Sequence, residues 1–148
     1  MIDKLISIRQ ANLGDAEQVV RLVQELAEYD GDTSPITPEF VLQYLGGIER
    51  QILLADLHGQ ILGMLSYSVQ PDLYHGGPVG TIELLVVRQA ERGQGVGSAL
   101  VREVIRRARA QRWVEVSVST MPENQPAIEF YKKHGFTDLA VLLEQHLN

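Results

Sequence analysis

Apolar residues recur along the chain at two different spacings, and each spacing predicts a type of element. Four of them stand at helical spacing and predict an amphipathic helix over residues 16–29: Val19, Leu22, Val23 and Leu26. A shorter helix is expected from the Thr37-Pro38 pair to about Leu45, because threonine is a favourable N-cap and proline fits the first turn. Further helical patterns cover residues 98–112 and 127–134.

Runs of β-forming residues separate these helices. They predict strands over residues 5–9, 51–57, 60–69, 81–87, 113–119 and 140–146. His58-Gly59 indicates a hairpin turn, whereas the glycines and prolines of residues 71–80 indicate a loop. Residues 79–119 form a strand–helix–strand unit, whose two strands are expected to be parallel. The pattern therefore predicts an α/β fold with a mixed sheet, in one domain spanning residues 1–148.

The composition narrows the possible chemistry. The chain contains no cysteine, which excludes disulfides, thiolate metal sites and a cysteinyl acyl intermediate. Its four histidines stand at positions 58, 75, 134 and 146, without the spacing of metal ligands, so no metal is expected. His134 is expected near the C-terminus of a helix, where the partial negative charge favours it.

The formal net charge of −6 argues against a nucleic-acid partner, because phosphate contacts need clustered lysines and arginines. This acidic balance is compatible with a cationic amine substrate, and it is also a common route to solubility. No apolar run reaches the roughly 18 residues of a membrane span. The opening Met1-Ile2-Asp3-Lys4 has no signal-peptide layout. We therefore expect a soluble, cytoplasmic protein without a membrane partner.

A glycine-rich segment between the 81–87 run and the next helix carries the clearest chemical signal. Glycines let the backbone come close to a ligand, and the free N–H groups of a first helical turn favour an anion. A phosphate-bearing ligand is therefore expected at this segment, which consists of Arg92, Gly93, Gln94, Gly95, Val96, Gly97 and Ser98. The alternative is a flexible surface turn, but glycines so close to a helix start weaken its initiation.

Two familiar phosphate-binding loops do not match this segment. The P-loop requires a lysine followed by serine or threonine after its last glycine, and here Ser98 follows Gly97 directly. The dinucleotide fingerprint requires a glycine at its sixth position, which Leu100 occupies when counted from Gly95. The sequence does match the pattern Arg-x-x-Gly-x-Gly, through Arg92, Gly95 and Gly97.

A second motif follows at residues 124–136, where Asn124, Ala127, Phe130-Tyr131 and Gly135-Phe136 stand at fixed offsets. Together the two motifs resemble the GNAT superfamily of acetyl-CoA-dependent N-acetyltransferases. The resemblance is close over residues 81–136 and extends loosely to the first helix. It implies a mostly antiparallel mixed sheet flanked by about four helices, with a central parallel unit splayed to hold acetyl-CoA. Homodimers are frequent in the family, and residues 140–146 could pair across such an interface or stay in their own sheet.

The resemblance also assigns the cofactor contacts. The pyrophosphate of acetyl-CoA would lie on the segment from Arg92 to Ser98, and the pantetheine arm would enter the gap beside Leu85, Val86 and Val87. In the family that strand is bulged, and its free N–H groups stabilise the thioester oxygen. Asn124 would contact the pantetheine arm; alternatively it caps the following helix, and both roles are compatible.

Glu83 is the candidate base that would remove the proton from the attacking amine, directly or through a water molecule. Strand alternation is expected to place it on one face with Thr81, Leu85 and Val87, among mostly apolar neighbours. Burial there would make the carboxylate a stronger base, and in the resembling family a glutamate at this place often serves so. The alternative is a glutamate on a wet strand face without a catalytic role.

Tyr131 is the candidate acid that would protonate the departing thiolate, as the tyrosine of the Phe-Tyr pair does in the resembling family. The alternative is a tyrosine that only packs, with its hydroxyl bonded elsewhere. No metal is needed for either step. Both residues favour an enzyme over a non-catalytic acyl-CoA-binding sensor, which would need neither.

The acceptor is less well specified by the sequence. A small primary amine is expected, such as a polyamine, an amino acid, an amino sugar or an aminoglycoside; a protein N-terminus or lysine is the alternative. Glu28 and Tyr29 end the first helix, and a carboxylate beside an aromatic ring suits a cationic amine. They are the candidate acceptor residues, although an ordinary polar helix end would have the same composition.

Overall fold

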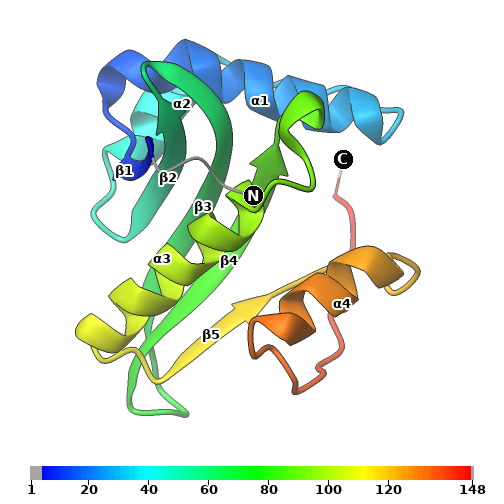
Figure 1. Cartoon of the computed structure of the whole chain (residues 1–148). Coiled ribbons are helices and arrows are strands. Elements are labelled where there is room, and N and C mark those ends of the chain that lie inside the picture. Colours follow the sequence, from blue (N-terminus) through cyan, green and yellow to red (C-terminus); the bar gives the residue numbers. More distant parts are fainter. Residues whose placement is uncertain (1–4, 148) are drawn as a thin grey trace.

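A five-stranded mixed sheet forms the centre of the computed structural model, which describes residues 5–147 (Figure 1). Its strands lie side by side in chain order: β1 (Ile6–Gln10), β2 (Arg50–Leu57), β3 (Gln60–Asp72), β4 (Gly77–Val87) and β5 (Glu115–Val118). The pairs from β1 to β4 are antiparallel, and β4 and β5 are parallel. The predicted mixed, mostly antiparallel α/β fold is confirmed, with the parallel pair at one edge of the described sheet.

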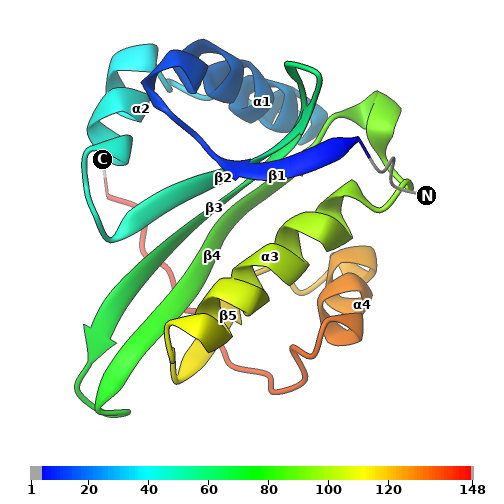
Figure 2. The same cartoon turned by 60° about the vertical axis from the view of Figure 1, so that its left-hand side comes forward.

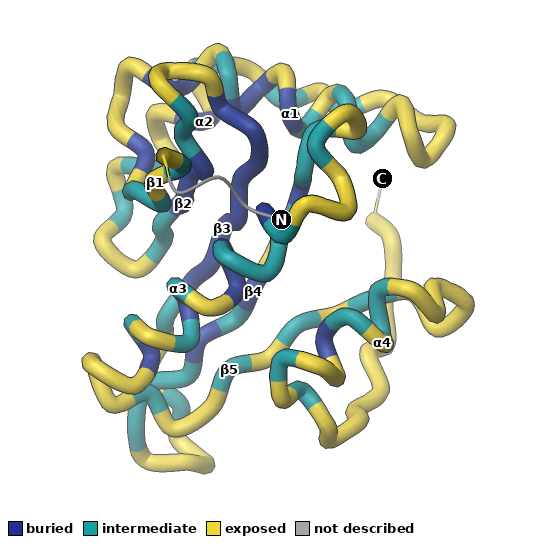
Figure 3. The backbone as a smooth tube through the Cα atoms, in the orientation of Figure 1, coloured by how far each residue is buried: buried dark blue, intermediate teal, exposed yellow. Residues whose placement is uncertain are grey.

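In the described part of the chain, four α-helices cover the two faces of the sheet (Figure 2). They are α1 (Ala16–Tyr29), α2 (Pro38–Leu45), α3 (Val96–Ala110) and α4 (Gln125–Lys133). α1 and α2 pack on one face, over a core that includes Ile52, Leu54 and Met64. α3 and α4 pack on the other face, over a core that includes Leu53 and Leu65. Because successive strand residues point to opposite faces, β2 and β3 contribute to both cores, and both strands are buried over their central residues (Figure 3).

The helix boundaries follow from the local sequence. α1 covers the predicted residues, and α2 begins as predicted because the Thr37 side chain accepts a hydrogen bond from the Phe40 N–H at 3.1 Å. Two short 3₁₀ turns, Leu13–Asp15 and Gln89–Glu91, join the neighbouring elements. No helix in the described range 5–147 has the length and apolar character needed to cross a membrane.

The loop predicted for residues 71–80 is wrong. β3 continues to Asp72 and β4 begins at Gly77, so only residues 73–76 form the turn, and Pro71 lies opposite Pro78 in the ladder. β2 no longer accompanies β3 here, since its pairing ends at Arg50 opposite Ser68. Proline is tolerated at such a free strand edge, where its missing N–H costs little.

The strand predicted for residues 140–146 is also wrong. After α4 the chain has no regular secondary structure up to residue 147, and its large apolar side chains face solvent. A β-forming run becomes a strand only where a neighbouring strand accepts its hydrogen bonds, and no strand in the described range pairs with it. β5 is therefore an edge strand. Residues 1–4, judged above to lack a signal-peptide layout, and residue 148 lie outside the described range.

Candidate active site

β5 stops pairing with the parallel strand β4 halfway along β4. Their pairing ends at Ile82 opposite Val118, while β4 continues to Val87. A cavity of about 210 Å³ opens at this point. It brings together four of the predicted site residues, Glu83, Leu85, Asn124 and Tyr131; Ile82, Leu84, Ala127 and residues 118–120 complete its lining. The splayed parallel unit implied by the resemblance is therefore present.

A β-bulge in β4 lies at the mouth of this gap. Ser66 lies opposite Leu84 and Tyr67 opposite Ile82, so Glu83 is an extra residue without a partner on β3. A one-residue insertion exchanges the faces of all following side chains. Ile82, Leu85 and Val87 consequently pack toward α3 and α4, whereas Leu84 and Val86 pack toward α1 and α2. The predicted shared face of Thr81, Glu83, Leu85 and Val87 is wrong for this reason.

Glu83 faces solvent at the bulge and is not buried among apolar neighbours, so that expectation is wrong. Its carboxylate accepts a 2.6 Å hydrogen bond from the hydroxyl of Tyr44 on α2. Burial raises the pKa of Tyr44 well above its usual range, and the hydrogen bond to Glu83 adds to this. Tyr44 therefore remains a donor and orients the Glu83 carboxylate. The sequence offered no motif for Tyr44, since an aromatic residue on an apolar helix face is usually only core.

The glycine loop ends in a helix N-terminus without a side-chain cap. Gly93 and Gly95 have φ values of 78° and 88°, in the left-handed region, and Gly95 is the N-cap of α3. No side chain caps this helix, and the first helical hydrogen bond runs from the Ala99 N–H to the Gly95 carbonyl. The N–H groups of Val96, Gly97 and Ser98 therefore stand before that first bond, at the positive end of the helix dipole.

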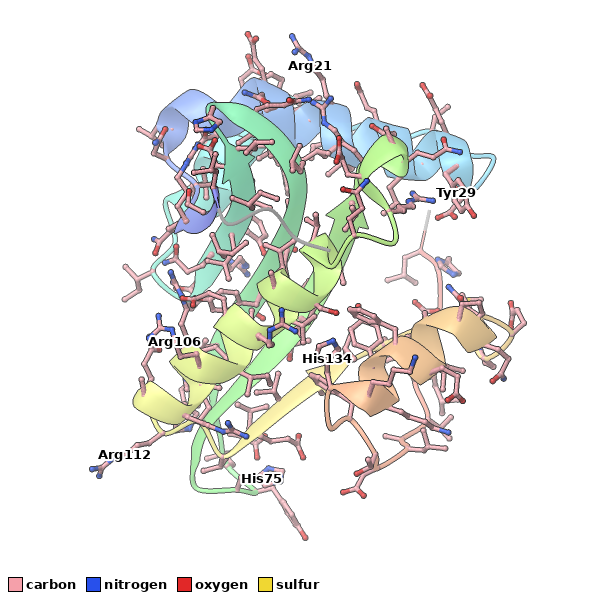
Figure 4. All side chains as sticks on the ribbon, viewed as in Figure 1. Arg21, Tyr29, His75, Arg106, Arg112 and His134 are labelled. Atoms are coloured by element: carbon pink, nitrogen blue, oxygen red, sulfur yellow. The ribbon has the colours of Figure 1, made fainter. Side chains whose placement is uncertain are left out.

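Arg92 does not point freely into solvent. Its Nε donates to the Val87 carbonyl at 3.2 Å, and its guanidinium lies 4.4 Å from the centre of the Tyr29 ring. These contacts tie the glycine loop to the end of β4 and to the end of α1. Tyr29, which Figure 4 shows at the end of α1, is consequently beside the loop. Neither Tyr29 nor Glu28 is among the residues that line the cavity. The two predicted acceptor residues are therefore not part of the lining that contains Glu83.

The start of α3 is docked against α4. The Ser98 hydroxyl and His134 Nε2 are hydrogen-bonded at 3.0 Å, and His134 is the C-cap of α4, as expected from the sequence. Burial, aided by the charge of Arg102, lowers the pKa of His134. A methyl group added at Gly97 would meet the Phe130 ring at 3.5 Å, so the two helices pack closely here.

Tyr131 lines the cavity from α4 and is 9% exposed. Its ring packs edge-on against Phe130 and Phe136. Burial raises the pKa of its phenol to about 12, so the hydroxyl is protonated at neutral pH. In the range 5–147 that hydroxyl has no hydrogen-bond partner, which contradicts the alternative of a hydroxyl bonded elsewhere. Tyr131 therefore has a proton available for a group in the cavity.

Asn124 is the N-cap of α4, which is the role predicted for it as the alternative to a cofactor contact. Its side-chain oxygen accepts a hydrogen bond from the Ala127 N–H at 3.2 Å, at the start of α4. Its side chain also lines the cavity, so a second contact with a ligand is geometrically compatible with the cap. Across the described range, no group of three or more His, Asp or Glu side chains could hold a metal ion.

Comparisons with known proteins agree with this geometry. Residues 18–136 match the model of the acetyltransferase (GNAT) family. An aminoalkylphosphonate N-acetyltransferase from Salmonella typhimurium is 30% identical over 129 residues, covering 87% of this chain and 83% of that protein. A thialysine N-epsilon-acetyltransferase from Sus scrofa is 27% identical over 145 residues, covering 90% and 85%. A crystal structure of a transcriptional regulator from Bacillus halodurans C-125 superposes with a TM-score of 0.84 at 29% identity, covering 96% and 99%.

Proposed function

The chain belongs to the acetyltransferase (GNAT) family and is an N-acetyltransferase, and from this premise we propose that it transfers the acetyl group of acetyl-CoA to the primary amine of a small molecule. Members of the family use acetyl-CoA. The similar proteins from S. typhimurium and S. scrofa are named for small amine substrates, which supports a small-molecule acceptor. The observation that carries the proposal is the cavity between β4 and β5, which is lined by Glu83 on one side and Tyr131 on the other.

The proposed cofactor site follows the wall formed by β4 and α3. The N–H groups from Val96 to Ser98 hold the pyrophosphate, because they are uncapped and lie at the positive end of a helix dipole. The pantetheine arm lies along Leu85, Val86 and Val87, where β4 has lost β5 as a partner. Main-chain N–H groups of this stretch stabilise the negative charge that develops on the thioester oxygen. Asn124 contacts the same arm from the opposite wall.

In the proposed reaction the acceptor amine attacks the thioester carbonyl directly within a ternary complex. Glu83 takes the amine proton, itself or through a water molecule, and Tyr44 orients the carboxylate through the 2.6 Å hydrogen bond. A C–N bond forms as the C–S bond breaks, and the sulfur leaves with the electron pair. Tyr131 then donates its phenolic proton to the thiolate. The amide and the free thiol of coenzyme A are the products.

A thiol-release assay with acetyl-CoA and a panel of amines tests this proposal. The panel contains amino acids, aminophosphonates, polyamines, amino sugars, an aminoglycoside and a lysine-containing peptide. Release of free thiol with at least one small amine, together with the acetylated product by mass spectrometry, is the expected result. Acetylation of the peptide alone would replace the small-molecule acceptor with a protein acceptor.

We also propose that two copies of the chain associate through the segment after α4. Leu139, Val141 and Leu143 are at least 80% exposed in the single chain, and the edge of β5 lacks a partner strand within the described sheet. Exposed apolar residues at alternate positions favour burial against a second copy. Light scattering is expected to give twice the chain mass, and Leu143→Glu is expected to give the monomer. A monomeric wild-type protein at micromolar concentration would refute the dimer.

A further inference from the structure

The sheet face beneath α2 changes from apolar to polar at one row of residues. In the ladder Arg50 lies opposite Ser68, Ser68 opposite Thr81, and Thr81 opposite Ser117. Their chain neighbours Tyr67, Ile82 and Val118 belong to the core under α3, so this row points to the other face. The next residues of that face toward the core are Ile52 and Ser66, followed by Leu54 and Met64. The polar row therefore borders the apolar core at the level of the bulge.

Arg50 is linked to Glu83 through a single side chain. The Arg50 guanidinium lies 5.9 Å from the centre of the Tyr44 ring, and the hydroxyl of that ring donates to Glu83 at 2.6 Å. One tyrosine thus contacts a cation and a carboxylate that come from strands β2 and β4. A ligand with an amine at Glu83 and an anionic group a few bonds away would lie along Tyr44 and reach Arg50.

The charge of Arg50 is only weakly compensated. Within residues 5–147 its one ion pair is with Glu49, its neighbour in the chain, at 3.4 Å, and both side chains are 43% exposed. Such exposed pairs contribute little to stability. Arg9, Arg106 and Arg107, in contrast, make ion pairs of 2.7 to 2.9 Å with carboxylates. The guanidinium groups of those arginines are engaged by carboxylates at short distance, whereas Arg50 remains able to bind an external anion.

We propose that Arg50 binds an acidic group of the acceptor, so that the substrate is a short amine carrying a carboxylate, phosphonate or phosphate. The inference rests on the proposed function and narrows its substrate class. A guanidinium forms two parallel hydrogen bonds with such an oxyanion, which fixes the amine at Glu83 in one orientation. Arg50 is in this sense a specificity-determining residue of the acceptor site.

The test compares matched amines with and without the acidic group. β-Alanine and 2-aminoethylphosphonate are the anionic substrates, and β-alaninamide and propylamine are their neutral counterparts. The wild-type enzyme is expected to acetylate an anionic amine with a kcat/KM roughly 10- to 100-fold above that of its counterpart, since a hydrogen bond to a charged group has about that value. The two anionic substrates also distinguish a carboxylate from a phosphonate.

Arg50→Gln is expected to remove this preference by raising the KM of the anionic amine. The kcat for the anionic amine, the kcat/KM of the neutral amines and the acetyl-CoA affinity should stay within about twofold of the wild-type values. Arg50→Lys is expected to restore part of the preference. Arg21→Gln, on the outer face of α1, is the surface control (Figure 4). Arg88→Gln is the competing candidate, because the Nε of Arg88 is buried without a partner in the described range.

Three results would overturn the inference: equal kcat/KM for anionic and neutral amines, a preference that survives Arg50→Gln, or one that Arg88→Gln removes instead. In each of these cases acetylation itself is still observed, so the proposed function stands. If none of these four amines is acetylated but another small amine of the thiol-release panel is, the inference fails and the proposed function stands. If no amine of that panel is acetylated while acetyl-CoA binds, both fail together.

Discussion

The two walls of the cavity perform complementary tasks with different parts of the chain. The wall formed by β4 and α3 offers main-chain groups, from a bulged strand that has lost its neighbour and from a helix N-terminus whose cap is a glycine. The wall formed by β5 and α4 offers side chains, namely the protonated phenol of Tyr131 and the amide of Asn124. The helix on the first wall has no side-chain cap, and the helix on the second is capped by Asn124.

This difference determines how each wall responds to mutation. Main-chain donors cannot be removed by truncating a side chain, so the first wall is sensitive to added atoms and to altered backbone angles. The second wall is sensitive to the loss of single functional groups. Glu83 is sensitive to both kinds of change. Its carboxylate is a single functional group, and the backbone bulge on the first wall sets the direction of its side chain.

The largest effect is expected from Gly95→Trp. The residue has a φ of 88°, which side-chain-bearing residues rarely adopt, and an indole there would fill the space in front of the uncapped N–H groups. We expect acetyl-CoA affinity to fall at least about 100-fold, measured by isothermal titration calorimetry.

Gly76→Trp is the matched control for Gly95→Trp. Gly76 has a φ of 66° and open space around it, in the turn between β3 and β4, at the opposite end of β4 from the glycine loop. It should share the backbone strain and leave acetyl-CoA affinity unchanged. An unchanged affinity in Gly95→Trp itself would remove the phosphate site from this loop.

The second wall is tested by Tyr131→Phe. Loss of the phenolic proton donor is expected to lower kcat roughly 100-fold, with acetyl-CoA affinity within about threefold of wild type. Tyr29→Phe, on an exposed side chain outside the cavity, is the control. If Tyr131→Phe retains the wild-type kcat, the acid role is refuted and the wall contributes packing only.

The raised pKa of Tyr131 also has a consequence for stability. The folded protein holds the proton up to about pH 12, whereas the unfolded chain releases it near pH 10. Stability from this group is therefore full below pH 10 and is lost as the pH rises toward 12. Urea unfolding at pH 9 and pH 11 should show a smaller decrease in Tyr131→Phe than in the wild-type protein, and equal decreases would contradict the shift.

A smaller effect is expected from changes at the bulge. Glu83→Gln should lower kcat/KM roughly 10- to 100-fold and abolish the rise of the rate with increasing pH that deprotonation of a base produces. Tyr44→Phe keeps the carboxylate and loses its 2.6 Å hydrogen bond, so it should retain that pH dependence with a lower rate. A pH–rate profile unchanged in Glu83→Gln would exclude Glu83 as the base.

The smallest effect is expected from Asn124→Ala. Removing the cap of α4 should decrease the free energy of unfolding by about 1 kcal/mol, because one N–H of the first turn loses its acceptor. If Asn124 also contacts the cofactor, acetyl-CoA affinity should fall a few-fold. Thr37→Ala removes the equivalent cap of α2 and should show the stability change alone. Identical behaviour of the two variants would restrict Asn124 to capping.

Local patterns were sufficient for most of the helices and strands. The spacing of Val19, Leu22 and Leu26 predicted α1 correctly, and the Thr37-Pro38 pair predicted the start of α2, because both signals involve only neighbouring residues. The prediction failed for residues 71–80 and 140–146. Whether those segments are strands depends on a partner from another part of the chain, which the local pattern does not contain.

The candidate site also has one part that local patterns predict and another part that depends on tertiary packing. The order and type of its residues, including the glycines before α3 and the Asn124 and Tyr131 positions, could be read from the sequence, because they belong to motifs of fixed spacing. The partners of Glu83 could not. Tyr44 is 39 residues away from it in the chain and Arg50 lies on another strand, so only packing brings them together.

The amino-acid sequence by itself determined the helices, most of the strands, the glycine turn and the acyltransferase motifs, since each depends on interactions within a few residues. Only the tertiary structure decided where β4 and β5 separate, that Glu83 is the bulged residue, and which side chains face it. Register and strand separation are set by the packing of α1 to α4 on the two faces of the sheet, which is a property of the whole folded chain.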